Sequence, residues 1–117
     1  MSRLTEAQVT PGQQGMSALK QAAIEEYMAQ IEGWEVVDVQ EVPRLQRTYR
    51  FDDFVQALDF TNQVGVIAEE VDHHPVLELT WGRVTVSWWT HVIDGLHKND
   101  FIMAARTDQI YAGYEED

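Results

Sequence analysis

An alternation of apolar and polar side chains marks residues 76–90, which read Val-Leu-Glu-Leu-Thr-Trp-Gly-Arg-Val-Thr-Val-Ser-Trp-Trp-Thr. Successive side chains of a strand point to opposite faces of a sheet, so the pattern predicts strands at Val76–Thr80 and Arg83–Thr90. Trp81 and Gly82 fall near the predicted turn. One face of the second strand is expected to carry Val84, Val86 and Trp88, and the other Thr85, Ser87, Trp89 and His91.

A second strand pair is predicted upstream, over residues 34–39 and 45–51, with Pro43 at the turn. Helical spacing of apolar residues predicts a helix from Ser17, its cap, to about Ile31, and a final helix over about 99–111. Gly33 is expected to end the first helix.

The central helix is expected to begin at Asp52 or Asp53 and carries two neighbouring apolar stripes. The first stripe is enough to cover one face of a sheet. It consists of Phe54, Ala57, Leu58, Thr61, Val64, Gly65 and Ala68. The second stripe consists of Phe60, Ile67 and Val71. It indicates burial against either a partner subunit or the core of the same chain, and both alternatives stay open.

The predicted order is helix, strand, strand, helix, strand, strand, helix. Short hairpins separated by helices favour an α+β fold, a four-stranded antiparallel sheet with helices packed on one face. The length of 117 residues corresponds to one domain. We expect residues 1–15 to form a mobile N-terminal arm, because they lack apolar periodicity, and residues 16–117 to form the domain.

The composition of the chain excludes several classes of binding partner and of catalytic chemistry. Eight Lys and Arg oppose 20 Asp and Glu, giving a net charge of −12. Such a field repels phosphate backbones and anionic lipids, so direct nucleic-acid or membrane binding is disfavoured. The chain has no cysteine, which excludes thiolate nucleophiles and disulfides. Without an apolar run long enough for a membrane span or a signal-peptide core, a cytoplasmic protein is expected.

Histidine is the side chain whose ordinary pKa lies nearest neutral pH, and three of the four histidines fall in one part of the chain. His73 and His74 are adjacent and precede Pro75, while His91 ends the predicted fourth strand. Two imidazoles at a helix exit can line a pocket from two directions and exchange protons there. Taken alone, His73-His74-Pro75 is more typical of a solvated polar turn than of a functional site.

The neighbouring polar and aromatic residues also have structural alternatives. Asp100 near the start of the last helix can satisfy helix-end amides. Glu69 can be a solvated helix residue, and Trp81 a core aromatic. Metal binding is a competing use of the histidines, but no His-Glu-x-x-His helix or one-turn histidine pair is present. We therefore expect no metal.

The motif resembles that of the pterin-4a-carbinolamine dehydratases, and the resemblance covers about residues 17–112. A Glu four residues before His-His-Pro is matched by Glu69, and the following aromatic by Trp81. The Thr-His pair is matched by Thr90 and His91. Gly95-Leu96 and then Asp100 complete the order.

The resemblance implies a homodimer or homotetramer that dehydrates 4a-hydroxytetrahydropterin to quinonoid dihydropterin without a cofactor. It implies histidine acid/base catalysis in tetrahydropterin recycling. The catalytic residues would be His73, His74 and His91. The residues that bind the pterin or orient the imidazoles would be Glu69, Asp72, Trp81, Thr90 and Asp100.

The sequence departs from the family at His97, where Ser or Thr often caps the last helix, so Asn99 is expected to cap instead. Other members of the family imply two alternatives. One is a non-catalytic dimerisation or assembly-factor module of the same fold. The other is a role in molybdopterin metabolism.

Overall fold

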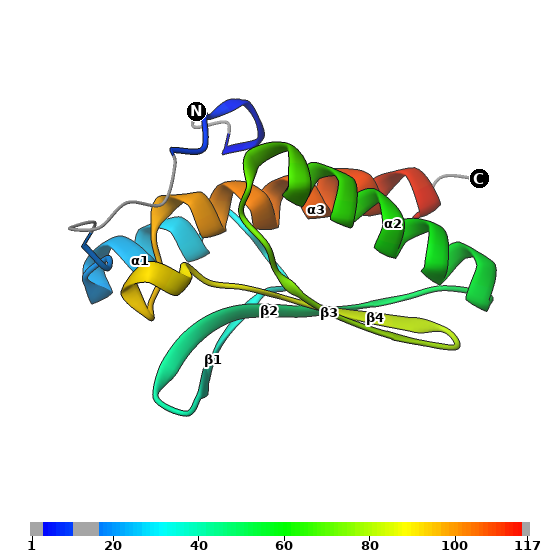
Figure 1. The fold of residues 1–117 in the computed structure, drawn as a ribbon, viewed down its shortest axis with the longest axis horizontal. Helices are drawn as coiled ribbons and strands as arrows, with labels where there is room; N and C mark the ends of the chain where they lie inside the picture. Colours follow the sequence, from blue (N-terminus) through cyan, green and yellow to red (C-terminus); the bar gives the residue numbers. More distant parts are fainter. Residues whose placement is uncertain (1–3, 11–16, 116–117) are drawn as a thin grey trace.

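Four antiparallel strands form one sheet in the order β1-β2-β4-β3 in the computed structural model, which describes residues 4–10 and 17–115. Helices α1, α2 and α3 lie on the same face of that sheet (Figure 1). The α+β class and the predicted order of elements are confirmed. The bounds are η1 Leu4–Glu6, α1 Gln21–Met28, β1 Glu35–Val39, β2 Val42–Arg50, α2 Phe54–Val71, β3 Val76–Thr80, β4 Arg83–Trp88, η2 His91–Ile93 and α3 Lys98–Glu115.

The predicted inner face of β4 is confirmed, since Val84, Val86 and Trp88 are fully buried. The strand is shorter than predicted and ends at Trp88, because the chain then bridges Thr90 to Gly95 and folds into η2. His91 therefore begins a 3₁₀ turn instead of ending a strand.

The first hairpin turns earlier than predicted. Gln40 and Glu41 both have positive φ, 53° and 69°, as a tight two-residue turn between twisted strands requires. Pro43 is not at the turn but inside β2, opposite Asp38. The turn was missed because neither residue in it is a Gly, Asn or Asp.

The predicted start of α2 is confirmed: Asp53 caps the helix and accepts a hydrogen bond from the backbone N–H of Gln56 at 2.9 Å. Phe60 is fully buried and packs against the Tyr49 ring, and Ile67 and Val71 also pack on the core, so the second stripe faces the core of the same chain. Two members of the first stripe, Phe54 and Leu58, do not cover the sheet as expected but are exposed, as are Val55 and Val66.

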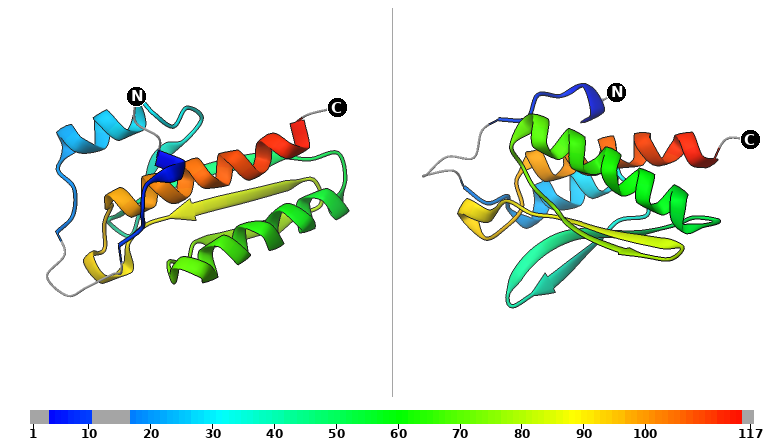
Figure 2. Two further views of the ribbon diagram at one scale, coloured as in Figure 1. Left: turned by 90° about the horizontal axis from the view of Figure 1, so that it is seen from above. Right: turned by 45° about the vertical axis from the view of Figure 1, so that its right-hand side comes forward.

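Helix α1 is shorter than predicted at both ends. Ser17 does not cap it. The N–H of Leu19 instead donates to the carbonyl of Leu96 at 2.9 Å. This bond holds the chain before α1 extended, and Lys20 is the last extended residue. Helix α3 is longer than predicted, because Tyr111 and Tyr114 continue its contact with the rings beneath α2. In Figure 2, α2 and α3 run side by side across the sheet.

Part of the expected N-terminal arm packs on α3. Leu4 is buried, and the guanidinium of Arg106 donates to the carbonyls of Thr5 and Ala7 at 3.2 and 2.7 Å. Residues 1–3 and 11–16 of that arm lie outside the described part of the chain. Within residues 4–10 and 17–115, no helix combines the length and apolar character needed to cross a membrane.

Asp108 fastens α3 to the sheet. Its carboxylate accepts hydrogen bonds from Trp34 Nε1 at 3.0 Å, Arg47 Nη1 at 2.8 Å and the Tyr49 hydroxyl at 2.5 Å. Burial raises the pKa of Asp108, against the opposing effect of these three donors. The pKa of Tyr49 is also raised, by burial first and then by the Asp108 charge. The junction holds α3 above β2.

Candidate functional site

The end of α2 turns His73 inward. Asp72 takes the left-handed conformation, with φ 53°, and the N–H of His73 donates back to the carbonyl of Ala68 at 3.1 Å. This closure is a common way to end a helix, and Asp tolerates it better than most residues. The imidazole of His73 stacks on the buried Trp88 ring, with centroids 5.7 Å apart and planes within 6°.

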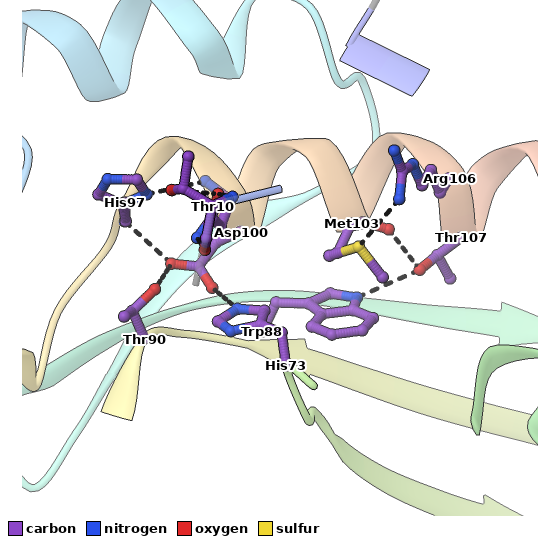
Figure 3. Close-up of polar contacts among 10 residues, drawn as sticks. Thr10, His73, Trp88, Thr90, His97, Asp100, Met103, Arg106 and Thr107 are labelled. Atoms are coloured by element: carbon purple, nitrogen blue, oxygen red, sulfur yellow. Dashed lines mark hydrogen bonds and ion pairs between the residues drawn. The ribbon is translucent and has the colours of Figure 1, made fainter. Parts of the chain in front are cut away.

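Asp100 is the buried partner of His73. Its Oδ1 lies 2.7 Å from His73 Nε2, and its Oδ2 accepts from the Thr90 hydroxyl at 2.8 Å and the His97 N–H at 2.9 Å (Figure 3). The Asp100 side chain is fully buried, and a buried carboxylate needs such donors. Helices α2 and α3 and the chain after β4 therefore meet at one carboxylate.

His97 caps α3. Its Nδ1 accepts the N–H of Asn99 at 3.1 Å, while Asp100 reaches back to the His97 N–H. The arrangement resembles a capping box, with an imidazole in place of the usual hydroxyl, Asp100 in place of Glu or Gln, and the second N–H of the helix bound in place of the third. Asn99, expected to be the cap, instead binds the backbone of Thr10. Burial lowers the pKa of His97, with the charge of Asp100 opposing it.

The other two histidines are more exposed. His74 Nε2 lies 2.8 Å from Glu69 Oε1, with Asp72 Oδ1 3.9 Å from His74 Nδ1. The His91 ring packs on Trp89 with centroids 4.4 Å apart. The guanidinium of Arg44 also lies over the Trp89 ring, 3.8 Å from its centroid.

His73, His74 and His91 share one cavity of about 340 Å³. Its lining consists of Asp72, His73, His74, Thr90, His91 and Val92. The residues come from the exit of α2 and from the chain after β4, which the sheet brings to the same end. Three imidazoles, two of them held by carboxylates, can donate and accept protons around one bound molecule.

The structure brings together seven of the eight residues singled out from the sequence, either in the cavity lining or as partners of a lining imidazole. The seven are Glu69, Asp72, His73, His74, Thr90, His91 and Asp100. Trp81 is not among them. It lies beyond β3, whose five residues span about 17 Å, and lines a different cavity.

Sequence reasoning missed three contributors: Val92 in the lining, Trp88 behind His73, and His97 as the cap. The spacing of His97 and Asp100, three residues apart, was the available signal for a capping box. Within residues 4–10 and 17–115, no three His, Asp or Glu side chains are grouped so that they could hold a metal ion.

Known proteins are similar to this chain over most of its length. The family model for pterin 4 alpha carbinolamine dehydratase matches residues 17–110. A curated relative from Microcystis aeruginosa that carries this family's name is 49% identical over 111 residues, 95% of this chain and 96% of the relative.

Two solved structures are also similar. A transcriptional coactivator/pterin dehydratase from Brucella melitensis has a TM-score of 0.72 at 30% identity, covering 80% of this chain and 97% of that one. A pterin dehydratase-like RuBisCO assembly factor of the alpha-carboxysome has a TM-score of 0.58 at 20% identity, covering 68% and 89%, and it shows the shared fold alone. On the family match and the level of identity, the chain belongs to the pterin-4-alpha-carbinolamine dehydratase family.

Proposed function

We propose that this protein dehydrates 4a-hydroxytetrahydropterin to quinonoid dihydropterin, in tetrahydropterin recycling, by histidine acid/base catalysis. By homology, it is a hydro-lyase. The observation that carries the proposal is the gathering of His73, His74 and His91 on one cavity. An interaction-only module of this fold has no physical need for three imidazoles at one cavity.

The chemistry needs an acid and a base. The bond between C4a and its hydroxyl breaks with the electron pair on oxygen, and a proton from an imidazolium completes a water molecule. Electrons from a ring nitrogen assist the departure and leave a cation. A second group then removes a proton from that cation to give the quinonoid product, so the protons balance over one turnover.

We assign the leaving hydroxyl to His74 and His91, which are the more exposed imidazoles of the cavity. Glu69 holds the ring of His74 at 2.8 Å. His73, fixed between Trp88 and Asp100, serves as the other acid/base group or as a binding imidazole.

The remaining lining residues receive binding roles. Asp72 and Thr90 border the space in which the pterin would lie, and the hydroxyl of Thr90 is already committed to Asp100. Its part in substrate binding is therefore to hold that carboxylate in place.

Self-association belongs to the same proposal. Phe54, Val55, Leu58 and Val66 expose between 40% and 73% of their surface on α2. Apolar side chains gathered on one helix face are typical of protein interfaces. A homodimer or homotetramer that covers this face would remove them from water.

Stopped-flow decay of chemically generated 4a-hydroxytetrahydropterin tests the assignment. The wild type and Glu26→Gln, an exposed change on α1, should accelerate the decay equally. His74→Ala and His91→Ala should each lose roughly 10²-fold in kcat/KM, as expected for one acid/base group. A wild type no faster than buffer refutes the activity, and a silent histidine variant refutes the role of that residue.

A further inference from the structure

The sheet face opposite the helices carries matched side-chain pairs across β2 and β4. Thr48 and Thr85 share a hydrogen bond of 2.9 Å between hydroxyls. Gln46 donates to Ser87 at 3.2 Å. Both pairs sit at directly opposed positions, and cross-strand pairs of this kind stabilise a sheet.

The last opposed pair on this face breaks the pattern. Arg50 stands directly opposite Arg83, and like charges in this position destabilise a sheet. Within residues 4–10 and 17–115, neither guanidinium makes an ion pair or a side-chain hydrogen bond. Two of only eight basic residues therefore face each other, although the chain has 20 acidic residues that could have paired with them.

A cavity of about 440 Å³ adjoins this pair. Its lining consists of Arg50, Phe51, Thr80, Trp81, Gly82 and Arg83. The Trp81 side chain is 68% exposed, which is unusual for so large an apolar group. Two cations and an exposed aromatic face therefore border the same space.

The backbone fixes the geometry of this cavity. Phe51 donates to the carbonyl of Gly82 at 2.9 Å, joining the end of β2 to the β3–β4 turn. A Cβ at Gly82 would lie 3.2 Å from the Phe51 carbonyl, so the close approach favours glycine. The β3–β4 turn lies at the end of the sheet near the start of α2, away from η2 (Figure 1). The histidine cavity is lined by His91 and Val92 of η2 and is therefore a separate space.

We propose that Arg50, Arg83 and Trp81 form a binding site for a small anion, a carboxylate or phosphate attached to a planar ring. Guanidinium groups bind such anions through paired hydrogen bonds. The face of Trp81 supplies a stacking surface for the ring. The bound anion would neutralise the opposed charges, so binding would stabilise the folded state.

The test uses phenyl phosphate, inorganic phosphate and phenol as probes, at constant ionic strength set with sodium chloride. Thermal unfolding and the indole N–H signal of Trp81 in ¹H–¹⁵N spectra are the readouts. At about five times its Kd, phenyl phosphate should raise Tm by about 4 °C and shift the Trp81 signal. Inorganic phosphate should do so less, and phenol not at all.

Three variants separate the contributions. Lys20→Gln removes a remote exposed charge and should respond like the wild type. Arg83→Gln should lose the response and, without a probe, unfold at the same temperature as the wild type or higher. Trp81→Ala should keep the phosphate response and lose the preference for phenyl phosphate.

An equal response in Arg83→Gln, or no response in the wild type, overturns the proposal. So does a Trp81→Ala variant that still prefers phenyl phosphate. These readouts measure binding and not turnover, so they are independent of the dehydratase assay.

Discussion

The Nε2 atom of His73 lies 2.7 Å from Oδ1 of Asp100, a carboxylate without solvent exposure. The pair joins the exit of α2 to the first turn of α3. Because Asp100 also accepts bonds from Thr90 and His97, it both supports the fold and orients an imidazole of the proposed site.

Replacing Asp100 by Ala should therefore destabilise the protein. Three donors would lose their acceptor in a buried place, and breaking such a network costs about 3 kcal/mol. Urea unfolding measures the loss. Asp38→Ala, at an exposed position of β1, is the matched control and should change the free energy of unfolding by no more than about 0.5 kcal/mol. Equal effects in the two variants would contradict the role of Asp100.

His97 should behave as a helix cap that titrates. His97→Ala should cost about 1 kcal/mol, and His97→Ser, which restores a side-chain acceptor, should recover most of it. Loss of stability without recovery by serine would mean that the imidazole acts through packing and not through its cap bond.

The same cap predicts a pH dependence. The folded-state pKa of His97 is lowered from 6.5, chiefly by burial, so the unfolded chain takes up the proton first. The contribution of His97 to stability is thus complete above pH 6.5 and is lost as the pH falls toward the folded-state pKa. Urea unfolding at pH 7.5 and 5.5 should show a smaller decrease in His97→Ser than in the wild type. An identical decrease would contradict this assignment.

Two glycines should respond in opposite directions to alanine. Gly33 has φ 92°, and a Cβ there would lie 3.0 Å from the guanidinium carbon of Arg47, which binds Asp108. Gly33→Ala should cost more than about 1 kcal/mol. Gly113 lies inside α3 with open space around it, so Gly113→Ala should gain about 0.5 kcal/mol or more. Thermal unfolding that ranks the two in the reverse order would refute the account of Gly33.

Leu58→Asp should weaken self-association. This side chain is 40% exposed on the outer face of α2, and a charge there would be buried in the proposed interface. Light scattering should find a smaller assembly for Leu58→Asp than for the wild type. A monomeric wild type, or an unchanged assembly in Leu58→Asp, would remove α2 as the interface.

The sequence predicted those features that depend on local periodicity. The alternation at Val84, Val86 and Trp88 identified the core face of β4, and Asp53 identified the start of α2. Tertiary contacts decided the rest. The start of α1 depends on the bond between Leu19 and Leu96, which no local pattern reveals.

The site shows the same division. The order of histidines and acids along the chain was visible, and the structure brings His73, His74 and His91 to one cavity. Trp81 was assigned to the pterin site by the family resemblance alone, although the predicted strand Val76–Thr80 already separated it from His74 by the length of an extended strand.

The most direct measurement of the central claim is turnover by a variant without the cavity imidazoles. His73→Asn, His74→Asn and His91→Asn combined should retain the wild-type circular dichroism spectrum. The variant should lose the acceleration of 4a-hydroxytetrahydropterin decay to within about tenfold of buffer, whereas Glu26→Gln keeps it. A folded triple variant that turns over at the wild-type rate would contradict the account.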